Sequence, residues 1–348
     1  MKKVMVFPFI YENELECMGA YLNHEYEIAS LVSYPGWENG KEYCIHGKHY
    51  CVSFDFFESL ERCDILWICD NNIIIDTDDL LSYIQAAVDQ NKTVWIGRPI
   101  NEPALKNLMT LDPFGTHIIF PKKHLFDCGH TYQRLSTPVL AVGGFCQNMG
   151  KFGFQIAITR EFMLRGYHPL LVSSRSDAEF FGHYSIPNWK NVCASDNDKI
   201  MALNYYFSKL EHYYHPDLFV IGIPGAMLPN DLDYFFDFAT TAFQISQAIA
   251  IDDAVMILLC LDFESNAICE FTAQSEAKLG TPISFFSIDR KTIDFANTKE
   301  KGHPDFVKVS NNYLLRTINN CKLSNVSSIY TDSDFISSIV SSFIGNYS

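Results

Sequence analysis

Short apolar runs alternate with amphipathic segments in the first hundred or so residues. Apolar runs bounded by turn-forming or acidic residues are typical of buried strands, and an amphipathic segment with a polar start is typical of a helix. The alternation of strands with a helix favours a parallel sheet, so a Rossmann-like fold is expected for residues 1–112. The predicted elements are strands at 4–7, 28–32, 64–70 and 93–97 and a helix from Thr77 or Asp78 to about Asp89.

A stretch without periodicity separates this series from a second one. Residues 113–137 gather proline, glycine and lysine, which is typical of a linker. For 138–348 we expect a P-loop NTPase-like domain with a mostly parallel sheet. Residues 300–348 are polar, and their pattern predicts no particular element. The predicted strands of the second series are 139–142, 169–172, 218–222, 254–259 and 283–287, and the predicted helices are 151–165, about 199–214 and about 232–250.

The composition indicates a globular protein of two α/β domains. A chain of 348 residues exceeds one ordinary core, and 48% hydrophobic residues supply enough apolar surface to bury. An uninterrupted apolar run of about 18 residues and a signal-peptide pattern are both absent, so we expect a cytoplasmic protein that does not bind membranes. The 11 cysteines contain no C-x-x-C pair. We therefore expect reduced thiols packed in the core, and we predict no metal site.

The charge of the chain limits its partners. The formal net charge is −15, and no cluster of Lys and Arg interrupts it, so nucleic acid is not expected as a partner. A phosphate ligand remains compatible with this charge, because it needs only a local nest of N–H groups and one or two cations. A homo-oligomer is also compatible with the composition.

A glycine-rich loop joins the first strand of the second series to its first helix. The sequence over 139–152 is VLAVGGFCQNMGKF: a buried strand, a glycine loop and the start of an amphipathic helix. Backbone N–H groups in such a loop converge on an anion, and the helix dipole and the lysine ammonium add positive charge. The residues predicted to bind a phosphate or nucleotide here are Gly144, Gln147, Asn148, Gly150, Lys151 and Phe152.

Two features of this loop depart from the common phosphate-binding loop. Its spacing is G-x₅-G-K instead of G-x₄-G-K, and Phe152 stands where Ser or Thr would ligate Mg²⁺. The missing hydroxyl removes one metal ligand and weakens the case for ordinary ATP hydrolysis. A second interpretation stays open, in which the glycines serve a tight strand-to-helix turn beside a lysine that extends to solvent.

A second glycine turn follows the predicted strand at 218–222. We expect Gly222 and Gly225 of this Gly-x-Pro-Gly turn to approach the phosphates. An acidic residue usually ends this strand and holds Mg²⁺ through water, and Asp231 or Asp233 is a candidate substitute. A plain glycine turn without a ligand is the alternative.

Side chains elsewhere suggest further chemistry. Arg175 follows the strand at 169–172 and is a candidate for a bidentate contact to a phosphate or carboxylate. Glu179 and His183 are candidates for acid–base chemistry. Cys146 lies near a helix N-terminus, which lowers a thiol pKa, so it is a candidate nucleophile, and simple packing is the alternative.

Three resemblances rest on these residues. The stretch over 142–165, with its G-x₅-G-K spacing, resembles dethiobiotin synthetase. The order of a Rossmann-like domain before this loop resembles two-domain D-glutamate N-acetyltransferases, which have Met after the loop lysine. The Gly-Gly-Phe and Gly-Lys-Phe stretches and the order of elements resemble a clostridial peptide-maturation family of natural-product gene clusters.

These resemblances imply ATP, with or without Mg²⁺, as the ligand and a small precursor peptide as a partner. The leading hypothesis is a P-loop protein that acts, with ATP, in maturation of a ribosomal peptide or peptide-like natural product. One alternative is an acyltransferase that binds the pyrophosphate of CoA in the loop without needing the Mg²⁺ hydroxyl. Another is a scaffold with a degenerate loop that binds the peptide without catalysis.

Overall fold

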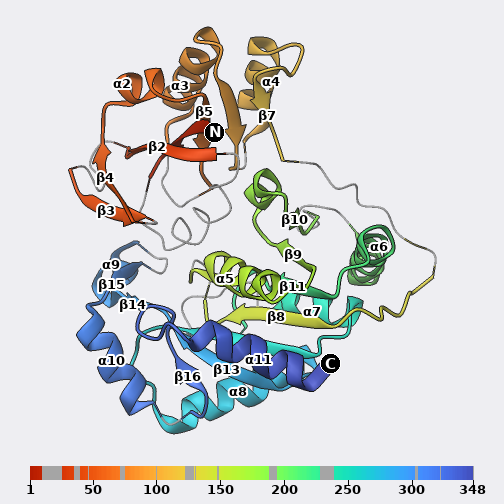
Figure 1. Cartoon of the computed structure of the whole chain (residues 1–348). Helices are drawn as coiled ribbons and strands as arrows, with labels where there is room; N and C mark the ends of the chain where they lie inside the picture. The colour runs from red at the N-terminus through yellow and green to blue at the C-terminus, as the bar shows by residue number, and fades with distance from the viewer. Residues whose placement is uncertain are drawn as a thin grey trace. The chain divides into compact units, whose positions relative to one another are not determined.

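The chain forms two compact α/β units (Figure 1). One unit comprises Met1–Lys123 with Arg175–Ser185, and the other comprises His124–Ser174 with Ile186–Ser348. In the computed structural model, the described residues are 1–9, 26–34, 40–45, 47–70, 75–98, 100–121, 129, 131–146, 149–187, 194–227, 239–301, 305–321 and 323–347.

A seven-stranded sheet forms the centre of the first unit, in the order β3-β4-β2-β1-β5-β6-β7. Neighbouring strands are parallel except for the β3–β4 hairpin. The helices begin at side-chain caps: Asp55, Asp76 and Asn101 each accept a first-turn N–H. The elements are β1 (Lys2–Phe7), β2 (Tyr26–Val32), β3 (Glu42–Ile45), β4 (Lys48–Ser53), α2 (Phe56–Glu61), β5 (Ile65–Ile68), α3 (Thr77–Asp89), β6 (Thr93–Ile96), α4 (Glu102–Leu111) and β7 (Ile118–Ile119).

One face of this sheet packs against the helices. Alternate strand residues such as Met5, Leu66 and Val94 form a buried cluster with Leu60 of α2 and Ile84 of α3. Each fully buried aliphatic side chain of this kind stabilises the fold by about 1.5–3 kcal/mol. Because successive side chains of a strand point to opposite faces of the sheet, every second residue faces the helices.

The opposite face of the same sheet is covered by a segment from much later in the chain. Trp95 of β6 stacks on Phe180 with ring centroids 5.1 Å apart, and Trp67 of β5 meets Phe181 edge-on at 5.0 Å. Both phenylalanines belong to the 3₁₀ helix η1 (Ser176–Phe181). The predicted ranges 1–112 and 138–348 had assigned this segment to the second domain, and the limits of independently folding domains stay a prediction.

A second seven-stranded sheet has the order β10-β9-β11-β8-β12-β13-β16, and all of its strands except β10 belong to the second unit. The strand pairs from β9 to β16 run parallel, and β8, β11 and β12 are buried along their whole length. Continuous apolar runs are typical of parallel strands covered on both faces. The elements are β8 (Val139–Gly144), α5 (Lys151–Leu164), β9 (Pro169–Ser173), β10 (Tyr184–Ser185), α6 (Asp196–Tyr214), β11 (Leu218–Gly222), α7 (Thr240–Ala248), β12 (Asp253–Leu258), α8 (Ser265–Leu279), β13 (Ile283–Ile288), β14 (Lys291–Ile293), α9 (Phe295–Lys301), β15 (Phe306–Lys308), α10 (Asn311–Asn320), β16 (Val326–Ser327) and α11 (Phe335–Tyr347).

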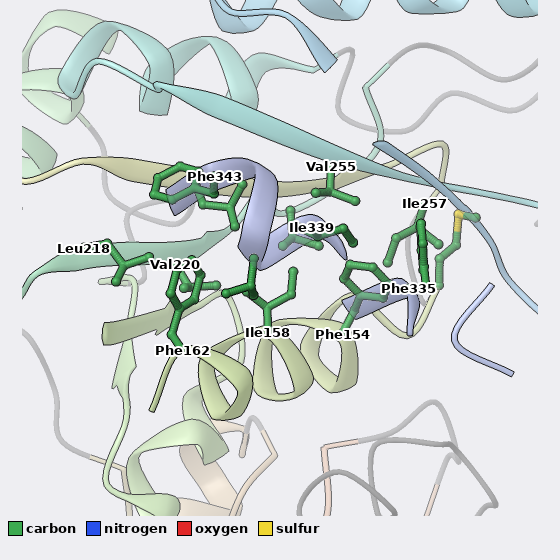
Figure 2. Packing of buried hydrophobic residues seen from close by; sticks show 14 of the residues in the cluster. Phe154, Ile158, Phe162, Leu218, Val220, Val255, Ile257, Phe335, Ile339 and Phe343 are labelled. Carbon is green, nitrogen blue, oxygen red and sulfur yellow. The ribbon is translucent and has the colours of Figure 1, made fainter. Parts of the chain in front are cut away.

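The C-terminal helix α11 packs with α5 on one face of this sheet, as Figure 2 shows. Phe154, Ile158 and Phe162 recur every four residues along α5, so they share one side of the helix. The ring of Phe162 meets Phe343 of α11 at 5.8 Å. At the end of α5, the Arg165 guanidinium donates hydrogen bonds to Ser337 and Ser341 of α11. These contacts fix α5 on the sheet.

The other face of the second sheet carries α6. Phe219 of β11 points away from the α5 cluster and meets Phe207 of α6 at 5.6 Å between ring centroids. In turn, α6 packs against α7 and α7 against α8. The second sheet therefore lies between two layers of helices.

The predicted α/β class is confirmed, with one mostly parallel and one parallel sheet. The predicted strands of both series are present. The helix expected at about 232–250 is described only as α7, because residues 228–238 lie outside the described part. The sequence did not predict the β3–β4 hairpin, the helices α2, α4 and α8, the short elements β7, η1, β10, β14 and α9, or the elements beyond residue 301. Within the described residues, each helix is too short or too polar to span a membrane.

The packing of α11 generates a stability prediction. Phe343→Ala removes a buried ring that touches Phe162, and large-to-small changes of this type cost about 3–5 kcal/mol. Urea unfolding should show this loss for the second unit. The control Phe243→Ala, whose ring is 48% exposed on α7, should change the free energy of unfolding little. Equal losses for both variants would contradict the proposed packing of α11.

Candidate functional site

The glycine loop starts at the centre of the second sheet. Its strand, β8, pairs with β11 on one side and β12 on the other, so three parallel strands end at the same edge. Ligands of open α/β sheets bind outside these carboxyl ends. The loop leads from Gly144 to Gly150 and into α5.

Gly150 occupies the N-cap of α5 in a left-handed conformation, with φ at +61°. A residue with a side chain would be strained there, since only glycine adopts this conformation readily. The first intrahelical bond described runs from the Phe154 N–H to the Gly150 carbonyl at 3.1 Å. The amides of residues 151–153 therefore precede the helical hydrogen-bond ladder, at the positive end of the helix dipole.

The Lys151 side chain joins two loops. Its ammonium donates to the Gly225 carbonyl at 2.5 Å and to the Cys146 carbonyl at 3.4 Å. The lysine stem passes close to Gly144, where an added Cβ would lie 3.3 Å from the lysine Cδ. Four of the residues named from the sequence, Gly144, Gly150, Lys151 and Gly225, are thus brought together.

Backbone hydrogen bonds hold the start of the loop. The Phe145 N–H donates to the Ile257 carbonyl of β12 at 2.8 Å, and the Met227 N–H donates to the Gly144 carbonyl at 3.3 Å. The Phe145 ring packs against Phe271 of α8 at 5.3 Å. The start of the loop, at Gly144 and Phe145, is therefore anchored to its neighbours on both sides.

Cys146 is fully buried in the core cluster beneath the loop. Its backbone N–H approaches the Met149 sulfur at 2.9 Å. A thiol with no solvent-exposed surface is poorly placed to attack a soluble substrate, so the packing role fits this geometry better than the nucleophile.

The position after Lys151 supplies no metal ligand. Phe152 is only 3% exposed, so its ring is enclosed by the protein. The neighbouring strand β11 ends at Gly222 and continues with Ile223 and Pro224, none of which carries a carboxylate. Among the described residues, no group of three or more His, Cys, Asp or Glu side chains could hold a metal ion. Asp231 and Asp233 lie outside the described part.

Gly222 has a packing role that the sequence did not indicate. A Cβ at this position would overlap the side-chain oxygen of Gln155 in α5. The amide nitrogen of Gln155 donates to the carbonyls of Val172 and Val220, at 3.2 and 3.3 Å. Gly222 therefore lets a buried polar side chain of α5 bond to the sheet, and its approach to a phosphate stays a prediction.

Arg175 belongs to the first unit, not the second. Its guanidinium forms a bidentate pair with the buried Asp177, with Nε–Oδ1 at 2.9 Å and Nη2–Oδ2 at 2.5 Å. The next residue, Ser176, donates its hydroxyl to the Gly97 carbonyl at 3.1 Å. Arg175 thus helps to fix η1 on its sheet, and its predicted contact with a ligand is untested. Gln147 and Asn148, also predicted to bind the ligand, lie outside the described residues.

The acid–base candidates Glu179 and His183 also lie in the first unit. Burial lowers the pKa of His183 to about 4, although the nearby Glu179 acts in the opposite direction. Glu179 accepts hydrogen bonds from the Ser185 N–H and hydroxyl at 2.7 and 2.9 Å. His183 is therefore neutral at pH 7, and so low a pKa makes it a weak proton acceptor.

One cluster beside the loop was not predicted from the sequence. It consists of Asp289 and Arg290, directly after β13, and Tyr330, shortly after β16. The predicted strand at 283–287 offered a signal, because polar residues directly after a parallel strand lie at the ligand-binding edge. Tyr330 had no such signal, since the pattern beyond residue 300 predicted no strand.

The contact between Gly222 and Gln155 can be tested by a double-mutant cycle. Gly222→Ala should destabilise the protein by about 1–3 kcal/mol, because it overpacks the α5–β11 contact. In a Gln155→Ala background the same change should cost less. Gly345→Ala, where a Cβ meets nothing within 4 Å, is the control and should be neutral or slightly stabilising. Additive losses in the double mutant would contradict the contact.

The comparisons with known proteins support the fold alone. No protein-family model matches the chain, and no curated protein matches it. The crystal structure of a DUF1611 family protein from Anabaena variabilis ATCC 29413 is similar, with a TM-score of 0.66 and 14% identity over 98% of this chain and 100% of that one. Aspartate semialdehyde dehydrogenase II from Vibrio cholerae, complexed with ASA, matches with a TM-score of 0.24, 12% identity and coverage of 64% and 68%, which supports no argument. The first similarity agrees with a two-part α/β architecture over the full length of the chain.

Proposed function

We propose that the second unit binds the phosphate groups of a nucleotide at the loop between Gly144 and Lys151. The observation that carries this proposal is the Lys151 ammonium, which bridges the loops after β8 and β11 beside the N-terminus of α5. Backbone amides, a helix dipole and an ammonium directed to one place form a site for an anion. The net charge of −15 does not exclude such a site, because an anion needs only a local nest of N–H groups and one or two cations.

The ligand in the leading proposal is ATP, and the role is in maturation of a ribosomal peptide or peptide-like product. This part rests on the resemblance of the glycine stretches to a peptide-maturation family and on the dethiobiotin-synthetase-like loop spacing. A small precursor peptide is then the second ligand. No side chain is assigned to the chemical step.

A specific observation favours CoA as a second candidate ligand. Phe152 is buried, and β11 ends without a carboxylate, so the usual protein ligands of Mg²⁺ are missing from two positions. The pyrophosphate of CoA can bind to amides and an ammonium without a metal ion. A CoA-dependent acyltransferase is therefore the alternative function.

Calorimetric titration of ATP, ADP and CoA, each with and without Mg²⁺, tests the proposal. Lys151→Ala removes the ammonium and should weaken nucleotide binding at least tenfold, which corresponds to about 1.4 kcal/mol. Lys209→Ala is the control, because this lysine lies over the Tyr205 ring on α6. It should leave the affinity unchanged. Thermal unfolding of both variants checks that they fold.

The outcomes separate the candidates. Equal affinity in the wild type and Lys151→Ala, or no binding in either, contradicts the proposal. CoA binding without Mg²⁺, combined with no ATP binding, selects the acyltransferase. Capture of a precursor peptide with no nucleotide dependence selects a non-catalytic scaffold.

A further inference from the structure

Three residues, Asp289, Arg290 and Tyr330, form a cluster at the carboxyl ends of β13 and β16. The Tyr330 hydroxyl donates to Asp289 Oδ1 at 3.1 Å, and the Arg290 backbone N–H donates to the same oxygen at 2.7 Å. The Arg290 guanidinium lies over the Tyr330 ring, 5.4 Å from its centroid. The Asp289 carboxylate is buried, whereas Arg290 and Tyr330 are half-buried.

This cluster borders the phosphate loop. The Tyr330 hydroxyl lies 3.8 Å from the point where a Cβ on Gly150 would stand. In the sheet order, β12, β13 and β16 lie on one side of β8. The strand β11 lies on the other side of β8. The contact of Lys151 with Gly225 lies on the β11 side, so the loop has its cation on one flank and the Arg290–Tyr330 pair on the other.

The chemistry of the pair suits a flat, partly polar group. Nucleobases stack on aromatic rings and on guanidinium planes, and this contact does not depend on reading the edge of the base. The Nε atom of Arg290 is buried and has no hydrogen-bond acceptor among the described residues. Asp289 accepts hydrogen bonds from the Tyr330 hydroxyl and the Arg290 backbone N–H, which fixes the tyrosine side chain and the backbone at Arg290.

We propose that Arg290 and Tyr330 bind the nucleoside part of the ligand whose phosphates occupy the loop. The inference rests on the proposed function. It narrows the ligand to a molecule that contains a nucleoside diphosphate group, as ATP, ADP and CoA do. In this arrangement the phosphates lie at the N-terminus of α5, and the nucleoside lies against the Arg290–Tyr330 pair. Asp289 is a positioning residue for this pair.

A purely structural role for Tyr330 makes a different prediction. The hydroxyl bond to Asp289 connects the segment after β16 to β13, so its loss would lower stability whether or not a ligand binds. Tyr330→Phe removes this bond and keeps the ring. Tyr330→Ala removes both.

Titration of the full-length protein with ADP, CoA and inorganic pyrophosphate distinguishes these roles. Tyr330→Ala should weaken ADP binding about tenfold or more and change pyrophosphate binding less than twofold, because only ADP carries a nucleoside. Tyr330→Phe should bind ADP nearly as the wild type does. Tyr313→Ala, a half-exposed tyrosine on α10, is the control and should leave both affinities unchanged. Should Tyr330→Ala fail to fold, Arg290→Ala is expected to show the same selective loss.

Failure of this inference differs from failure of the proposed function. If the wild type binds pyrophosphate but Tyr330→Ala and Arg290→Ala bind ADP as tightly as the wild type does, the nucleoside assignment is wrong and the phosphate loop stands. If these variants lose ADP and pyrophosphate equally, the cluster acts on the loop as a whole and the assignment is also wrong. If the wild type binds none of the three ligands, both proposals are wrong. If Tyr330→Ala weakens CoA binding as much as ADP binding, the adenosine of either ligand contacts the Arg290–Tyr330 pair.

Discussion

The Lys151 ammonium is the interaction on which the arrangement at the sheet edge depends. A partly buried ammonium needs acceptors, and here the carbonyls of Gly225 and Cys146 supply them. The same geometry suits an anion, because an ammonium that bonds to neutral carbonyls can exchange one of them for a charged phosphate oxygen. The bonds of this ammonium to the carbonyls are already charge-assisted, and under the proposal a phosphate oxygen in place of one carbonyl would add the attraction between two opposite charges.

Packing far from the loop determines where this ammonium lies. The α5 helix carries Lys151 at its first position, and its orientation is fixed by Phe162 against α11 and by Gln155 bonded to two strand carbonyls. Gly222 permits the Gln155 contact, and Gly144 leaves space for the lysine stem. Two glycines that were predicted as ligand contacts, Gly144 and Gly222, therefore also allow close packing around α5.

The sequence predicted the elements whose signal is local. The continuous apolar runs of β8, β11 and β12 can be recognised without knowledge of the fold, and the glycine loop followed by an apolar helix located the candidate site. The contacts of the η1 segment with Trp67 and Trp95 join residues about a hundred positions apart, so no local pattern could have predicted them. Helix α8 was missed because its buried residues Ile268 and Phe271 stand among polar ones. Tyr330 gains its place beside Gly150 only through the order of strands, which no local pattern encodes.

The central claim is that the amides at the start of α5, with Lys151, receive a phosphate group. Amide NMR of the protein titrated with inorganic pyrophosphate measures this most directly, since each backbone N–H reports its own hydrogen bond. The account predicts saturable shifts concentrated at Gly150, Lys151, Phe152 and Gly153. Saturable binding that leaves these four amides unmoved, or no binding at all, would contradict it.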